Sequence, residues 1–328
     1  MGKNKREPVH ESYEMASGPI AYNMTNDYMF RAILQKNEFV LRGLIGALLH
    51  LDQADIKSVE ITNPIILGEQ IENKQFVLDI NITLNNNICL NLELQVINRT
   101  NWQDRSLIYL CRMFDRLQRG EDYAESGCAI HIGILDFTLF EEVPEFYACY
   151  KMLNVKNHHV FNEKFVLNVL DLKRIDLATE EDKHYEIDCW ARMFKAGTWE
   201  ELRMIAEKNK YMSEAAMAMY ELNADEIIRQ QCMAREEYNR YEKMMARKLA
   251  EANEQLAEAN EQLAEANEQL AGANEQLAEA RKDAEEAKER AEQEHRNVVE
   301  ATRQFEQERS NYEAEIARLQ ELIAQKQN

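Results

Sequence analysis

Proline and cysteine are scarce in this chain, and both are absent from its C-terminal part. The 328 residues include four prolines and six cysteines, none of which lies after Cys232. Because proline interrupts helices, the C-terminal segment is free to continue as one helix. The cysteines show neither a CxxC pair nor the Cys/His spacing of a zinc site, so we interpret them as reduced core thiols in a cytoplasmic protein.

Long apolar runs and an excess of basic residues are also lacking. No stretch reaches the roughly eighteen apolar residues that a membrane-spanning helix requires, and the first residues lack the apolar segment of a secretory signal. We therefore expect no membrane contact. The net charge is −20, with 39 Lys and Arg against 59 Asp and Glu. This balance counts against a protein whose whole surface is basic and coats nucleic acid. Any contact with nucleic acid must then come from a local cluster of basic residues.

Two runs of alternating residues, joined by three asparagines, organise residues 75–97. Their apolar positions are Phe76, Leu78, Ile80, Ile82 and Leu84, then Leu90, Leu92, Leu94 and Val96. Such alternation around a turn is typical of an antiparallel hairpin with one buried face. With 85–87 as the loop, Leu84 pairs with Ile88, and counting outward places Asp79 opposite Glu93.

This register places two carboxylates side by side. Directly opposed residues have Cβ atoms about 5 Å apart, so Asp79 and Glu93 would repel each other. A divalent metal such as Mg²⁺ would relieve the repulsion, since it is commonly held by one or two carboxylates with water and phosphate oxygens. The alternative is a solvated strand face that carries scattered polar residues.

A helical pattern precedes the hairpin, from residue 25 to residue 51, with a break expected near Asn37. Asp27 lies at its start. We predict that Asp27 caps this helix, and the alternative is that its carboxylate reaches a metal site.

A second helix is predicted over residues 101–120, with Asn101 as its N-cap and Gly120 as its end. Its predicted apolar face is Leu107, Leu110, Phe114 and Leu117. A stripe of basic and aromatic residues lies on the opposite face: Arg105, Tyr109, Arg112, Arg116 and Arg119. We expect this stripe to contact DNA phosphates, and the alternative is a solvated face balanced by acidic neighbours such as Asp104 and Asp115.

Further strands are predicted at 54–64, 128–140 and 165–172, followed by several short helices from Ala178 onward. The order helix, strand, strand, strand, helix, strand predicts a mixed α/β sheet with the hairpin at its centre. His158 and His159 lack acidic or cysteine partners at ligand spacing, so we interpret them as loop residues.

The C-terminal segment has a sevenfold repeat: EANEQLA occurs three times over 251–271, and GANEQLA follows. A sustained heptad predicts a coiled coil, and we expect a homodimer. In one register the leucines from Leu249 to Leu277 occupy position d, with asparagines at position a. In the other register the leucines occupy a and alanines occupy d. A single charge-stabilised helix is the remaining alternative.

Several of these motifs together resemble the Rpn-type recombination-promoting nucleases, or transposases, of the PD-(D/E)XK nuclease superfamily. The motifs are TNDYMFR, LDI, NLELQ, QRGEDY and GILDFTLF, and the similarity extends over about 20–245. The resemblance implies hydrolysis of DNA phosphodiester bonds with Mg²⁺ or Mn²⁺, with Asp79 and Glu93 as metal ligands. It places Gln95 beside the attacking water, where the superfamily has lysine, and Arg31 where relatives often carry lysine.

The sequence therefore predicts a PD-(D/E)XK-like α/β domain with a mixed sheet flanked by helices. We divide the chain into a leader (1–20), a nuclease-like domain (21–175), a helical subdomain (176–245) and a coiled coil (246–328). The expected catalytic residues are Asp27, Asp79, Glu93 and Gln95, and the expected DNA contacts are Arg31, Arg105, Tyr109, Arg112, Arg116 and Arg119. Two alternatives are an inactive nuclease-like DNA-binding protein and a functional coiled coil with a passive head.

Overall fold

A six-stranded sheet forms the centre of the fold in the computed structural model, which describes residues 12–65, 79–85, 88–98, 101–115 and 127–326. The strands are β1 (Val59–Ile61), β2 (Ile80–Leu84), β3 (Ile88–Gln95), β4 (Cys128–Leu135), β5 (Tyr147–Lys151) and β6 (Phe165–Asp171). Their order is β1-β2-β3-β4-β6-β5, with β3, β4 and β6 parallel and the other neighbours antiparallel. The expected mixed α/β sheet is confirmed, and β3 and β4 occupy its centre.

The β2-β3 hairpin has the predicted register. Its pairs are Leu84 with Ile88, Thr83 with Cys89, Ile82 with Leu90, Asn81 with Asn91, and Ile80 with Leu92. Asp79 directly precedes β2, so the same register continued by one residue leads to Glu93. Phe76 and Leu78, which the sequence assigned to the first run, lie outside the described residues.

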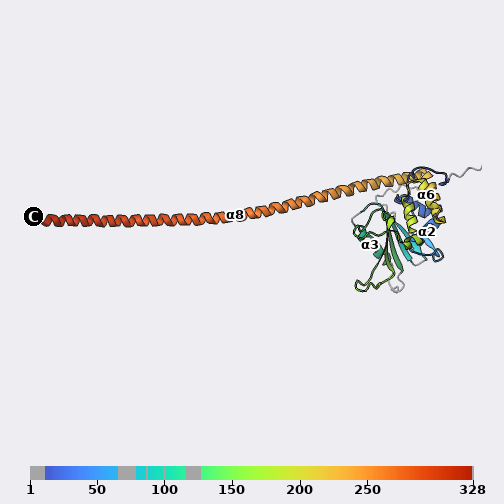
Figure 1. Cartoon of the computed structure of the whole chain (residues 1–328), viewed down its shortest axis with the longest axis horizontal. Coiled ribbons are helices and arrows are strands. Elements are labelled where there is room, and N and C mark those ends of the chain that lie inside the picture. Colours follow the sequence, from blue (N-terminus) through green and yellow to red (C-terminus); the bar gives the residue numbers. More distant parts are fainter. Residues whose placement is uncertain (1–11, 66–78, 86–87, 99–100, 116–126, 327–328) are drawn as a thin grey trace, which may run out of the picture. The chain divides into compact units, whose positions relative to one another are not determined.

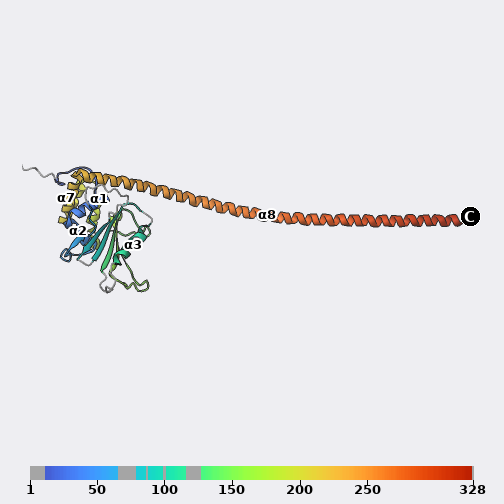
Figure 2. The same ribbon diagram turned by 180° about the vertical axis from the view of Figure 1, so that it is seen from behind.

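Helices cover both faces of the sheet, as Figures 1 and 2 show from opposite sides. One face carries α3 (Trp102–Phe114), which packs on the sheet through small apolar clusters around Trp102 and Leu110. The other face shares one apolar core with five helices and with Ile228 and Cys232 at the start of the C-terminal helix. The five helices are α1 (Asp27–Lys36), α2 (Glu38–Leu48), α5 (Ile187–Lys195), α6 (Trp199–Ala206) and α7 (Lys210–Ala224). A 3-10 turn (Ile175–Leu177) and α4 (Glu180–His184) connect β6 to α5.

Asn37 separates α1 from α2, which confirms the expected break. Its backbone N–H donates to the Ile33 carbonyl at 3.0 Å, and its side chain accepts from the Val40 N–H at 3.2 Å. One residue therefore ends the first helix and caps the second, because its amide oxygen replaces a missing intrahelical partner.

The chain divides into two compact units, Met1–Lys248 and Leu249–Asn328. Helix α8 (Glu226–Lys326) begins in the first unit and provides the described part of the second. Within the second unit the five leucines of the heptad series, Leu249 to Leu277, are each more than half exposed. None of the helices in the described ranges is long and apolar enough to cross a membrane.

Candidate active site

Glu93 lies among charged side chains on the sheet face that α3 covers. Alternation along β3 places Asn91, Glu93 and Gln95 on this face, and only 3% of Glu93 is exposed. Burial, and then repulsion from Asp79, raises the pKa of Glu93 to about 7. Burial also raises the pKa of Asp79. The charged form of Glu93 is therefore disfavoured by Asp79, which is the repulsion that the hairpin register predicts.

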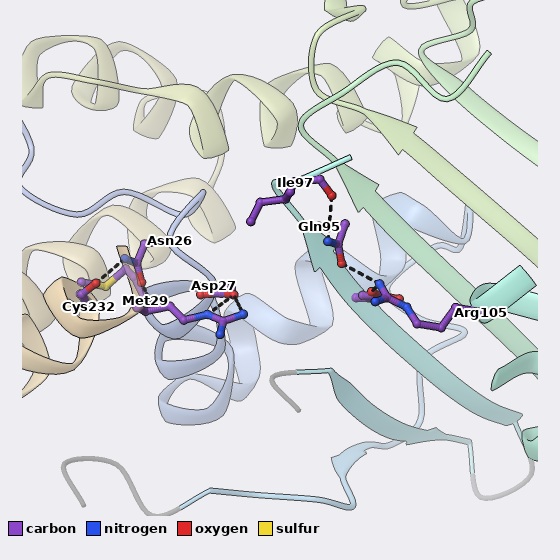
Figure 3. Close-up of polar contacts among 9 residues, drawn as sticks. Asn26, Asp27, Met29, Gln95, Ile97, Arg105 and Cys232 are labelled. Atoms are coloured by element: carbon purple, nitrogen blue, oxygen red, sulfur yellow. Dashed lines mark hydrogen bonds and ion pairs between the residues drawn. The ribbon is translucent and has the colours of Figure 1, made fainter. Parts of the chain in front are cut away.

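Arg105 of α3 joins Glu93 to Gln95. Its Nη2 donates to Glu93 Oε1 in a short ion pair and to Gln95 Oε1 at 2.7 Å. Gln95 Nε2 donates in turn to the Ile97 carbonyl at 2.9 Å, so both ends of the amide have partners (Figure 3). The amide that was expected beside an attacking water is thus fixed in orientation by Arg105 and Ile97.

Asn26, and not Asp27 as predicted, caps α1. Asn26 has extended backbone, and its Oδ1 accepts from the Met29 N–H at 3.2 Å while its Nδ2 donates to the Cys232 carbonyl at 2.9 Å. Asp27, labelled in Figure 3, is already inside the helix. Its Oδ2 accepts from Arg235 Nε of α8 at 2.6 Å. Burial raises the pKa of Asp27, and the bond to Arg235 opposes this rise.

Arg31 is buried and supports Asp79. It is 1% exposed, its Nη1 donates to the Asp79 carbonyl at 2.6 Å, and its Nη2 donates to the Asn63 carbonyl. Asn63 Nδ2 also donates to the Asp79 carbonyl, at 2.9 Å. Arg31 was expected to contact DNA, but its burial corrects this expectation: its guanidinium holds the backbone at the start of β2.

The rotation of α3 differs from the prediction. Its buried residues are Trp102, Ser106, Leu110 and Met113. Leu107, predicted on the apolar face, is 48% exposed, because the large Trp102 ring sets which side of the helix meets the sheet. Arg105 and Tyr109 border the buried face, and Arg112 is exposed. The remaining members of the stripe, Arg116 and Arg119, lie outside the described residues.

The site balances its carboxylates with arginines. The carboxylates are Asp27, Asp79 and Glu93, and the arginines are Arg31, Arg105 and Arg235. Within the described ranges, no three His, Cys, Asp or Glu side chains are grouped so as to hold a metal ion. Glu93 Oε2 and Asp27 Oδ1 are nevertheless buried without a hydrogen-bond partner. Carboxylate oxygens are the donors that Mg²⁺ and Mn²⁺ prefer, so Asp79 and Glu93 fit a divalent cation that competes with Arg105.

The first unit is thus an α/β domain with a mixed sheet and an acidic pair at the open end of its β2-β3 hairpin. The family model of the PD-(D/E)XK nuclease family transposases matches residues 24–249, which is more than half of the chain. The chain therefore belongs to the PD-(D/E)XK nuclease family transposases, and its membership supports a nuclease-like function. A search of curated proteins and a search of solved structures gave no match.

Three residues beside the site were missed by the sequence analysis. His131 on β4 and Trp102 on α3 are buried next to Glu93, and Arg235 bonds to Asp27. A signal existed for His131, since a histidine within an otherwise apolar strand needs a polar partner. No local signal existed for Arg235, because its partner lies 208 residues earlier in the chain.

Proposed function

We propose that this chain is a Mg²⁺- or Mn²⁺-dependent DNA endonuclease that hydrolyses phosphodiester bonds during recombination or transposon-like movement of DNA. The observation that carries the proposal is the repelling pair of the partly buried Asp79 and the buried Glu93, in a chain that belongs to a nuclease family. A protein that only binds DNA gains nothing from a pair of repelling carboxylates that are largely shielded from water. A nuclease uses such a pair to hold a cation.

Each side chain of the site has a separate task in this proposal. Asp79 and Glu93 would hold the cation, which when bound supplies a water of lowered pKa and positive charge for the phosphate. Arg31 keeps the backbone of Asp79 in place. Gln95 would orient the attacking water through its amide, which requires Nε2 to leave the Ile97 carbonyl. An amide donates a hydrogen bond but supplies no full positive charge, so we expect slower turnover than with lysine at this position.

Exposed basic residues flank the site and provide contacts for the DNA backbone. Arg112 lies on the solvent side of α3. On the other side, Arg240 and Lys243 of α8 line a cavity of about 350 Å³ together with Val96, the neighbour of Gln95. We assign these three cations to DNA phosphates and keep Arg116 and Arg119 in the same role. Phosphate contacts position the duplex and carry no direct sequence information.

We extend the proposal to a homodimer formed through the second unit. The leucines of the heptad series on α8 are more than half exposed, and in the described part of that unit no other element covers them. A stripe of leucine on a long helix is stabilised when it packs against a partner helix. Two copies would bring two cutting sites to one duplex.

The second candidate is a DNA-binding protein without nuclease activity. The observation that favours it is the pairing of Arg105 with both Glu93 and Gln95, which neutralises the acidic site without a metal. In this case the coiled coil would recruit partners while the first unit holds DNA.

Cleavage of supercoiled plasmid separates the two candidates. The full chain is assayed with Mg²⁺ or Mn²⁺ beside Asp79→Asn, Glu93→Gln and an EDTA control. Glu60→Gln, at an exposed carboxylate of β1, is the matched control. Nicking that is lost in both site variants and in EDTA, but kept in Glu60→Gln, supports the endonuclease. Absence of cutting with every divalent ion, together with DNA binding that Arg112→Glu weakens, supports the binding protein.

A further inference from the structure

Buried polar atoms without hydrogen-bond partners gather behind Glu93. By strict hydrogen-bond geometry they are Glu93 Oε2, Trp102 Nε1, and both ring nitrogens of His131, and the Trp102 N–H is close enough to Glu93 to lower its pKa. Buried polar groups in proteins are almost always hydrogen-bonded, so several exceptions in one place require an explanation. All of them belong to residues at most 4% exposed, which excludes bulk solvent as their usual partner.

The parallel pairing of β3 and β4 brings these groups together. Glu93 pairs with Gly133, and His131 is the preceding residue of β4 on the same face. A Cβ atom at Gly133 would lie 2.2 Å from Trp102 Cζ2, so the missing side chain leaves the space that the indole ring fills. The rings of Trp102 and His131 are 6.0 Å apart between centroids, and both border Glu93.

The two oxygens of Glu93 have different surroundings. Oε1 accepts from Arg105 on the side of Gln95. Oε2 faces the opposite side, where His131 Nε2 lies 3.6 Å away. This separation is too long for a hydrogen bond, but it leaves no room for another group between the two atoms.

We propose that His131 is a positioning residue for Glu93. Its Nε2–H, assisted by the indole N–H of Trp102, holds Glu93 Oε2 when a divalent cation replaces Arg105 at Oε1. This inference rests on the proposed function. Hydrogen bonds to the outer oxygen keep a ligating carboxylate in the rotamer that faces the metal, and the loss of such a partner usually weakens metal binding 10- to 100-fold. Catalytic hydrogen bonds that are long without ligand commonly shorten in the complex.

Two substitutions at His131 separate positioning from packing. His131→Gln keeps an N–H donor near the position of Nε2, whereas His131→Asn places its donor near Nδ1. Affinity for Mn²⁺ is measured on the full chain from the shift of the thermal midpoint with ion concentration. We expect about a 10- to 100-fold weaker Kd for His131→Asn, and a Kd close to wild type for His131→Gln. Trp102→Phe should weaken binding less than His131→Asn, and the exposed His159→Asn should not change it.

The outcomes distinguish this inference from the proposed function. If wild type and Glu93→Gln both show no shift with Mn²⁺, the metal site and the inference fail together. If Glu93→Gln loses the shift but His131→Asn keeps it, only the inference is overturned. Equal weakening in His131→Asn and His131→Gln also overturns it, because packing alone explains that result.

A measurement on the unmutated protein covers the case in which a variant does not fold. Long-range ¹⁵N–¹H correlations of the histidine rings show which nitrogen carries the proton. We expect the His131 proton on Nε2 in the presence of Mg²⁺. A proton on Nδ1 alone would contradict the assigned role.

Discussion

Arg235 and Asp27 are 208 residues apart in the sequence, yet Arg235 Nε donates to Asp27 Oδ2 at 2.6 Å. The pair joins the first turns of α8 to the start of α1. Only 14% of the Arg235 side chain and 6% of the Asp27 side chain are exposed, so each charge depends on the other for compensation. The nearby bond from Asn26 Nδ2 to the Cys232 carbonyl strengthens the same junction.

Removal of one partner of this pair should destabilise the first unit strongly. For Arg235→Met we expect a loss of about 3 kcal/mol in the free energy of unfolding, because Asp27 becomes an uncompensated buried charge. The double variant Asp27→Asn/Arg235→Met should recover part of this loss. Urea unfolding followed by tryptophan fluorescence is suitable, since all three tryptophans lie in this unit. Additive effects of the two substitutions would show that the pair is not coupled.

The pKa of Glu93 predicts a dependence of stability on pH. Folded Glu93 keeps its proton up to about pH 7, whereas the unfolded residue releases it near pH 4.5. The folded state therefore binds more protons in this range, and wild type should lose stability as the pH rises through it. Glu93→Gln has no such group to titrate. The difference in free energy of unfolding between Glu93→Gln and wild type should therefore shift in favour of the variant by on the order of 2 kcal/mol from pH 4.5 to pH 8.

The measurement for Glu93 is urea unfolding in EDTA at several pH values. Glu60→Gln, on the exposed side of β1, serves as the control and should follow wild type. Free energies of unfolding that change with pH in parallel for Glu93→Gln and wild type would contradict the raised pKa of Glu93.

Gly133 tests the packing of Trp102 on the sheet, and Gly272 on α8 is its control because its surroundings are open. Gly133→Ala should cost about 1 to 3 kcal/mol, because its Cβ would meet the ring of Trp102 and overpacking has this typical cost. Gly272→Ala meets nothing within 4 Å and should favour the helix by about 1 kcal/mol. Tryptophan fluorescence reports the first change, and circular dichroism of the helical signal reports the second. Equal stability of Gly133→Ala and wild type would show that Trp102 is loosely packed.

The exposed leucines of α8 predict the oligomeric state. Sedimentation equilibrium of the full chain should give a dimer. Four simultaneous changes to glutamine should give a monomer: Leu256, Leu263, Leu270 and Leu277. Glu258→Gln lies on the outer surface in both possible heptad registers, so it should leave the dimer intact. A wild-type monomer at high concentration would exclude dimerisation through this helix.

The sequence predicted those parts of the fold that local patterns determine. The register of the β2-β3 hairpin followed from period-two alternation and three asparagines, and the break at Asn37 followed from a polar residue between apolar runs. Asp79 and Glu93 were found for the same reason, since each has a fixed place in the alternation. Their proximity required no knowledge of the remaining chain.

Contacts between distant elements were not predictable in this way. The rotation of α3 depends on the space above Gly133, which only the assembled sheet creates. The expected contact of Arg31 with DNA failed because its partners, the Asp79 and Asn63 carbonyls, belong to other elements. Arg105 was expected to face DNA, and it turns inward because Glu93 offers a buried carboxylate.

The identical repeats of α8 set how this helix can change in length. Each copy of EANEQLA adds seven residues, which is roughly 10.5 Å along the axis. Seven residues are nearly two full turns, so a gained or lost copy rotates the following residues by only about 20°. Unequal exchange between copies can therefore adjust the reach of the helix in regular steps while its leucines stay in line.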